Sequence, residues 1–175
     1  MAAVVTRERV AARRLEANAD VFRALVDGVS PGQARWKPEP GKWSIVEVVN
    51  HLADEESEDF RRRLDLVLHR PGEPWPSIDP EGWARERGYA ERELGPSLER
   101  FLDERSRSVA WLRALASPDW ELAYDHPTMG RLRAGDLLAS WLAHDVIHVR
   151  QLARLQHGWL GEWARPFGTA YAGTF

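Results

Sequence analysis

Cysteine is absent from this 175-residue sequence. Its absence excludes disulfide bonds, thiolate metal ligands and a cysteine nucleophile. Any metal binding or catalysis by this chain must therefore use histidine, carboxylate or hydroxyl side chains.

The chain also lacks a strong charge of one sign, since its formal net charge is −3. Binding to a nucleic-acid backbone needs a basic surface, so we expect no nucleic-acid partner. No run of eighteen apolar residues occurs, so we expect no membrane-spanning helix. The first eight residues, MAAVVTRE, are too polar for the apolar segment of a signal peptide. We therefore expect a cytoplasmic protein.

Apolar residues recur at helical spacing in four stretches, at roughly residues 6–27, 44–69, 96–116 and 134–157. Gly28 and Gly158 are expected to stop the first and last of these helices, and Ser44 with Glu47 forms a capping box at the start of the second. The tail at 159–175 is expected to pack over the helices.

Strand evidence is thin, because no hairpin dipeptide lies between two alternating runs. With 43% hydrophobic residues, the chain is long enough to bury one sizeable core. We therefore predict an all-α protein, a four-helix bundle with long inter-helix links, in a single domain over residues 1–175.

His144 and His148 stand four residues apart in the last predicted helix, so both imidazoles lie on one helix face. That face also carries Trp141 and Leu152, and we expect the two histidines to point into the core. Burying imidazoles costs stability unless each nitrogen finds a partner. A metal ion bound by both rings is one solution, and hydrogen bonds within the core are the alternative.

His51, in the second predicted helix, is the candidate for a third ligand because the two inward histidines need a partner, although by itself it fits a boundary position better. Glu55 lies one turn further on the same face. It is a candidate fourth ligand, a group that orients a ligand, or a general base. A solvated carboxylate at the edge of the helix is the alternative.

Four acidic neighbours are expected to form a solvated face: Asp54, Glu56, Glu58 and Asp59. His69 and His157 are expected at helix C-terminal ends, where the helix dipole favours a positive side chain. His126 is expected in a surface loop. Gln151 lies on the side of the last helix that carries His144 and is expected to face the same site.

Three segments together resemble the DinB-like superfamily, the damage-inducible and YfiT-like metalloproteins. They are WKP at 36–38, GKWSIVEVVNHLADE at 41–55, and His144-x-x-x-His148 followed by Gln151. The order of the helices and the long middle link are also similar to that family, so the resemblance covers nearly the whole chain.

The resemblance implies a four-helix bundle, often a homodimer, that binds a divalent metal ion through His51, His144 and His148. It also implies a small-molecule substrate, since the family includes metal-dependent hydrolases and transferases that join low-molecular-weight thiols to electrophiles. Histidine ligands suit Zn, Ni, Fe(II) or Co. Three protein ligands leave an open position, where a bound water or thiol becomes a nucleophile near neutral pH. Because the chain has no cysteine, such a thiol would be a diffusible cofactor.

Two alternatives to an enzyme stay open: a non-catalytic metal- or ligand-binding bundle, and an interaction domain with three hydrogen-bonded histidines. In the enzyme hypothesis, Glu55 is the candidate catalytic group that orients the nucleophile or accepts its proton. The link at 71–88 is unusually long and holds Trp75 and Trp83, so we expect it to form the mouth of a pocket or a dimer contact.

Overall fold

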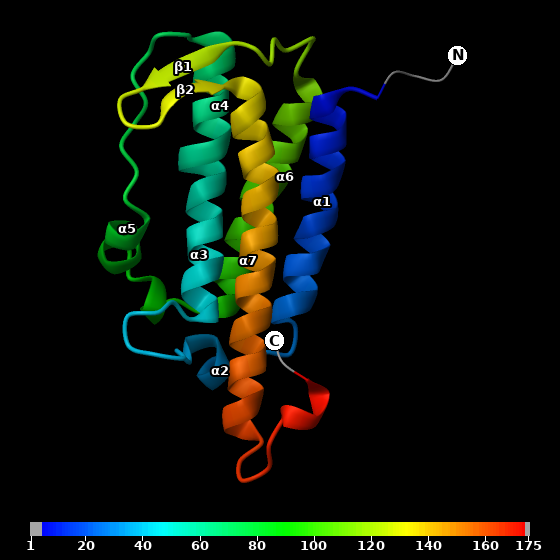
Figure 1. The fold of residues 1–175 in the computed structure, drawn as a ribbon, viewed down its shortest axis with the longest axis vertical. Helices are drawn as coiled ribbons and strands as arrows, with labels where there is room; N and C mark the ends of the chain where they lie inside the picture. The colour runs from blue at the N-terminus through cyan, green and yellow to red at the C-terminus, as the bar shows by residue number, and fades with distance from the viewer. Residues whose placement is uncertain (1–4, 174–175) are drawn as a thin grey trace.

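The computed structural model describes residues 5–173, in which four long helical stretches run side by side (Figure 1). The first is α1 (Arg7–Val26), the third is α6 (Leu94–Ala114) and the fourth is α7 (Ala134–Trp163). The second consists of α3 (Ile45–Asp54), a π-helical turn at Glu55–Phe60 and α4 (Arg61–His69). The predicted all-α four-helix bundle is confirmed.

Shorter elements connect the long ones. They are the helices α2 (Pro31–Arg35) and α5 (Pro80–Glu86), 3-10 turns at Tyr89–Glu91 and Ala170–Ala172, and a hairpin of β1 (Ala123–His126) and β2 (Gly130–Arg133). The hairpin lies across one end of the bundle, while α2 lies at the opposite end (Figure 1). No helix among residues 5–173 is long and apolar enough to cross a membrane.

The start of α3 matches the predicted capping box. Both the Ser44 backbone N–H and its hydroxyl donate to Glu47 Oε2 at 2.8 Å. These bonds satisfy backbone groups that a helix end otherwise leaves free. From this fixed start, α3 and the π-helical turn bring His51 and Glu55 into the middle of the bundle.

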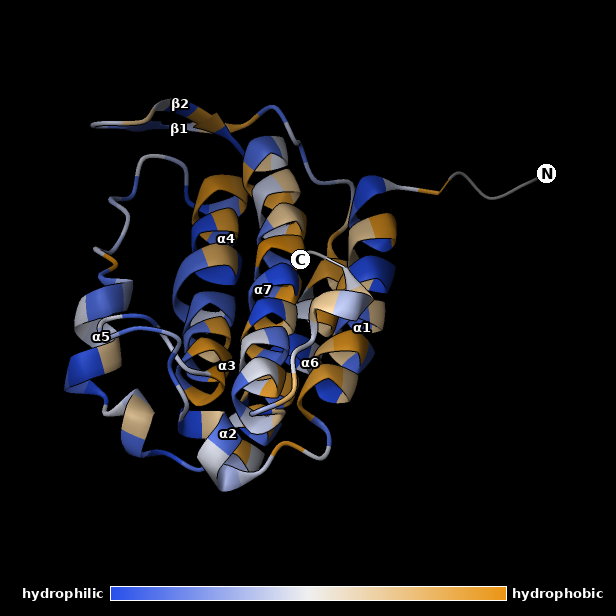
Figure 2. Ribbon diagram, turned by 60° about the horizontal axis from the view of Figure 1, so that its bottom comes forward, coloured by the Kyte–Doolittle hydropathy of each residue, from blue (hydrophilic) through white to orange (hydrophobic). Residues whose placement is uncertain are grey.

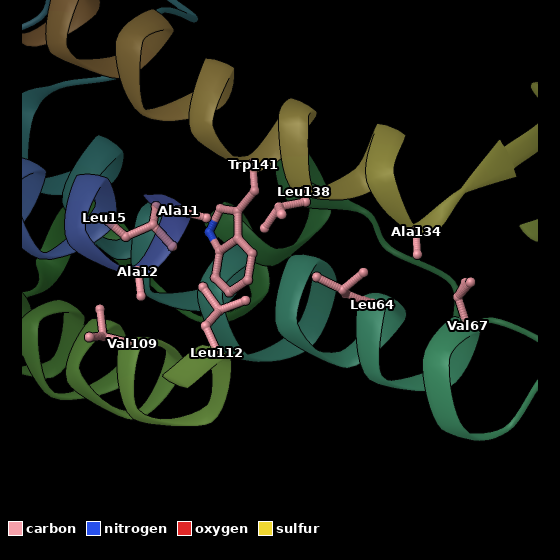
Figure 3. Packing of buried hydrophobic residues seen from close by; sticks show 10 residues of the cluster. All are labelled: Ala11, Ala12, Leu15, Leu64, Val67, Val109, Leu112, Ala134, Leu138 and Trp141. Carbon is pink, nitrogen blue, oxygen red and sulfur yellow. The ribbon is translucent and has the colours of Figure 1, made fainter. Parts of the chain in front are cut away.

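The apolar core forms two clusters, one toward each end of the bundle. Figure 3 shows the first, in which Trp141 points from α7 between residues of the neighbouring helices, among them Leu64 and Leu112. The second gathers around Phe22, whose ring packs edge-on against Phe101. Figure 2 shows orange and blue residues alternating along the long helices, as amphipathic packing requires. Buried polar residues such as Arg105 on α6 and Asp145 on α7 lie between the two clusters along their helices.

The second half of the chain differs from the sequence analysis in two details. The link before α7 contains the hairpin, which the sequence reading missed because its loop is three residues long and relies on Gly130 at φ +74°. Helix α7 does not stop at Gly158. A Cβ at that position would lie 2.7 Å from Trp36 Cη2, so this glycine permits close packing inside the helix.

The tail also differs from its prediction. As far as residue 173, the chain after α7 is mostly exposed, with Phe167 79% and Tyr171 fully exposed. It does not pack over the bundle, because the helices already cover the core without it.

Candidate metal centre

The three predicted histidines converge between α3 and α7. His144 Nε2 lies 3.0 Å from His148 Nε2 and 3.4 Å from His51 Nε2. One ligand nitrogen from each ring falls within 4.8 Å of the others. His51 and His148 are buried and His144 is half-buried. The structure therefore brings together residues that are 93 positions apart in the sequence.

Local structure explains this convergence. His144 and His148 occupy successive turns of α7, and their rings are 4.3 Å apart between centroids. His51 projects from α3, and its ring lies 4.8 Å from that of His148. Two larger aromatic rings flank the cluster: Trp43 lies 4.8 Å from His51, and Phe60 lies 5.0 Å from His144.

Burial keeps the three imidazoles neutral. Desolvation, reinforced by the neighbouring rings, lowers the pKa of His51 to about 2 and that of His144 to about 3. Desolvation also lowers the pKa of His148, although its hydrogen bond to Gln151 opposes the shift. Neutral imidazole is the form that binds a metal ion, because it has a free lone pair.

Hydrogen bonding fixes which nitrogen of His148 faces the cluster. Its Nδ1–H donates to Gln151 Oε1 at 2.7 Å, so the lone pair of the ring lies on Nε2. Gln151 thus faces the site, as predicted. His51 Nδ1, in contrast, is buried without a hydrogen-bond partner. Three neutral nitrogens, two of them 3.0 Å apart, are a donor set that fits one divalent ion.

Glu55 is buried beside this cluster, so the solvated alternative for it is wrong. Its Oε1 lies 3.7 Å from His51 Nδ1, on the opposite edge of that ring from Nε2. Burial, together with the neighbouring Asp59, raises the pKa of Glu55 to about 8. Among the described residues, the group of converging ligand atoms contains the three histidines and not Glu55.

The acidic neighbours do not form a solvated face. Asp54, Glu56 and Asp59 are buried, and only Glu58 has a substantially exposed side chain. The buried three pair with arginines in the following ion pairs: Asp54 with Arg87 and Arg100, Glu56 with Arg105, and Asp59 with Arg63. Sequence reasoning placed them in solvent because it could not see these partners, most of which come from other elements.

Arg105 is the residue of this region that the sequence reading missed. Its guanidinium forms two 2.7 Å hydrogen bonds with Asp145 and one of 2.8 Å with Glu56. Asn18 donates to Asp145, and Trp141 donates to Glu56. We call these five residues the Arg105 cluster. It joins α1, α6, α7 and the π-helical turn, and so fixes the segment of α7 that carries His144. The signal was available: Arg105 lies four residues after Phe101 and four before Val109, both buried.

The other histidines lie outside the converging group. His69 ends α4 as predicted, and pairs with Asp65. His157 is inside α7 and not at its end, because that helix continues to Trp163. His126 ends β1, and its Nδ1 accepts backbone N–H groups of the hairpin loop.

A pocket of about 330 Å³ has Trp43 in its wall, the residue whose ring contacts His51, although none of the three histidines lines the pocket. Glu81, Ala84 and Arg85 of α5 line its other side, so the long link does contribute to a pocket. Trp75 and Trp83 are not among its lining residues. Trp75 stacks on Tyr124 at 4.3 Å, and Trp83 lies under the guanidinium of Arg87.

The model of the DinB superfamily matches residues 14–152. The chain belongs to this superfamily. The match spans all three histidines of the site. A search of curated proteins found no match.

This DinB-superfamily chain is similar in structure to YfiT from Bacillus subtilis, with a TM-score of 0.76 and 19% sequence identity. The similarity covers 90% of this chain and 91% of the other. YfiT is described as "a probable metal-dependent hydrolase with an unusual four-helix bundle topology". At this level of identity, the likeness establishes the shared fold.

Proposed function

We propose that this protein binds one divalent metal ion through His51, His144 and His148, and that it is a metal-dependent enzyme acting on a small molecule. The convergence of three neutral imidazole nitrogens carries the proposal. The bond from His148 Nδ1 to Gln151 supports it, since it turns a lone pair toward the other two rings. The description of YfiT as metal-dependent supports it as well.

The ligand set is compatible with Zn, Ni, Fe(II) or Co, and the choice among them follows availability as much as affinity. When bound by three protein ligands, such an ion supplies an open position that lowers the pKa of a water or thiol and polarises an acceptor group. The residues of the chain hold it and limit access of solvent, since His51 and His148 are buried and Trp43 and Phe60 flank the rings.

The pocket beside Trp43 is the proposed place for the substrate. Hydrolysis, for which the description of YfiT is a precedent, is the first candidate reaction. Transfer of a low-molecular-weight thiol is the second, and it needs a diffusible thiol because the chain has no cysteine. We further propose that residues 1–175 form a single domain that works in the cytoplasm as a homodimer, as the family resemblance implies.

The position of Glu55 bears on whether the protein is an enzyme. Its carboxyl group lies toward Nδ1 of His51, whereas the proposed ion faces Nε2. This placement favours a role in orienting His51 over direct proton transfer. It also favours a second candidate function, a metal-binding bundle without catalysis, because no carboxylate of the described residues joins the converging nitrogens.

Kinetics of two variants separate these functions. The protein loaded with each candidate metal is assayed for hydrolysis of simple esters and amides, and for conjugation of a small thiol to an electrophile. His144→Ala should lose both metal and activity. Glu55→Gln should keep the metal and lose about 10²- to 10⁴-fold in rate if Glu55 is a general base.

If Glu55 only orients His51, Glu55→Gln should instead weaken metal binding by about 10- to 100-fold. Absence of turnover with every metal and both reactions, in protein that binds metal, would favour the non-catalytic bundle.

A further inference from the structure

His51, Glu55, Asp59 and Arg63 follow one another at four-residue intervals along the second long helical stretch. The stripe begins at the histidine cluster and continues through the π-helical turn into α4. Glu55 and Asp59 are 5% and 7% exposed, and the Arg63 side chain is 12% exposed. Burial of four consecutive polar groups on one helix is costly unless they satisfy one another.

The stripe is connected by contacts between its neighbours. Arg63 Nε lies 2.9 Å from Asp59 Oδ1 in an ion pair. The Asp59 and Glu55 carboxyl groups hydrogen-bond to each other. Glu55 Oε1 lies 3.7 Å from His51 Nδ1, and neither of these two atoms has a hydrogen-bond partner.

The direction of these bonds follows from the charges. Two carboxyl groups hydrogen-bond only when one of them carries a proton. Asp59 faces a guanidinium, so Asp59 is the anion that accepts and Glu55 is the group that donates. Glu55 Oε1 then remains as an acceptor, and the nearby Nδ1–H of His51 is a suitable donor. An imidazole protonated on Nδ1 has its lone pair on Nε2, the atom that faces His144.

The far end of the stripe is held by the link between α4 and α5. The Arg63 guanidinium lies 4.8 Å from the centre of the Trp75 ring, and its Nη2 donates to the Pro76 carbonyl at 3.3 Å. Trp75 in turn stacks on Tyr124 of the hairpin. Arg63 therefore has a fixed position from which to hold Asp59.

We infer that Asp59 and Arg63 are positioning residues of the histidine centre, which hold Glu55 against His51 and thereby direct His51 Nε2 toward the metal ion. The inference rests on the proposed metal-binding function. It gives the long link a role, because Trp75 and Pro76 anchor the stripe from outside the bundle.

Two measurements on Asp59→Ala test this role. Zinc affinity, measured by competition with a chelator, should fall about 10- to 100-fold, the usual effect of losing an outer-shell partner. Nitrogen NMR of the histidine side chains in metal-free protein should show His51 protonated on Nδ1 in the wild type and a mixture of tautomers in the variant. General loss of stability does not shift a tautomer ratio, so this second readout isolates positioning.

Two further variants serve as controls. Asp59→Asn keeps a carbonyl oxygen that accepts from Glu55, and should recover most of the zinc affinity. Asp65→Ala removes a carboxylate from α4 that pairs with Arg70 outside the stripe, and should leave affinity and tautomer unchanged.

Zinc affinity and a His51 tautomer in Asp59→Ala equal to those of the wild type would overturn the inference. A wild type that binds none of Zn, Ni, Fe(II) and Co would instead overturn the proposed function. In that event the tautomer comparison still decides whether Asp59 positions His51.

Discussion

The Arg105 cluster and the histidine cluster both lie in the middle of the bundle. Glu56 of the π-helical turn belongs to the first, and the adjacent Glu55 lies beside the second. In the Arg105 cluster, the guanidinium of Arg105 contacts two carboxylates, and both carboxylates also receive a neutral donor. Its charges are compensated, and only Glu56 Oε2 has no donor.

The histidine cluster, in which His51 and His148 are buried and His144 is half-buried, is not closed in this way. His51 Nδ1 and Glu55 Oε1 have no hydrogen-bond partner, and the three Nε2 atoms face one another without an opposite charge between them. Polar groups that only support a fold normally satisfy one another. The difference between the two clusters thus separates a structural polar network from a site whose three converging imidazole nitrogens fit a ligand.

The largest effect on stability is expected from a substitution in the Arg105 cluster. Arg105→Met leaves Glu56 and Asp145 as buried, unpaired charges, and should lower the free energy of unfolding by about 3–5 kcal/mol. Chemical denaturation measures the change. Arg107→Met, at a largely exposed side chain on the same helix, is the matched control and should change stability by less than about 0.5 kcal/mol. Equal effects of the two substitutions would mean that the Arg105 cluster does not support the fold.

A smaller effect on stability is expected from the histidine cluster, as a dependence of the free energy of unfolding on pH in metal-free protein. Because the folded-state pKa values of His51 and His144 lie far below the ordinary 6.5, the unfolded chain binds protons that the folded chain does not. Their contribution to stability is full above about pH 6.5 and declines as the pH falls toward 3. The raised pKa of Glu55 acts in the opposite sense, since its contribution is full below 4.5 and is lost as the pH rises through about 8.

With three histidines against one glutamate, metal-free protein should lose stability between pH 6.5 and pH 5. His144→Gln should make this decline shallower by at most about 1.4 kcal/mol per pH unit, the value for one proton. Denaturant midpoints at several pH values, with a chelator present, measure the slope. His69→Gln, at an exposed position outside the cluster, is the control. An unchanged slope in His144→Gln would contradict the burial of a neutral imidazole at that position.

The features that the sequence predicts are those marked by residues close together in the chain. The capping box at Ser44, the helical spacing of apolar residues and the four-residue interval between His144 and His148 are all readable within one helix. These signals predicted the bundle and the shared helix face of His144 and His148 correctly, and metal binding by that face stays a prediction. His51 is predicted as the third ligand for two reasons: it lies in a neighbouring helix of the bundle, and the segment around it resembles a family motif.

The parts that were missed depend on contacts between distant segments. Arg105 lies 49 positions from Glu56 and 40 from Asp145, so nothing near these acids in the sequence marks them as buried. Gly158 predicts a helix stop from the sequence alone, but it lies inside α7, where the absence of a side chain admits Trp36 from 122 positions away. The sequence shows that these residues are polar. It does not show their ion-pair partners, which come from distant segments and decide whether a polar residue is buried.

Metal content of tag-free protein tests the central claim most directly. Wild type and His148→Ala are purified in parallel, together with His69→Ala as a control outside the cluster, and analysed for Zn, Ni, Fe and Co after identical metal exposure and dialysis. The account predicts close to one divalent ion per chain in the wild type and in His69→Ala, and little or none in His148→Ala. Equal metal content in wild type and His148→Ala would contradict it.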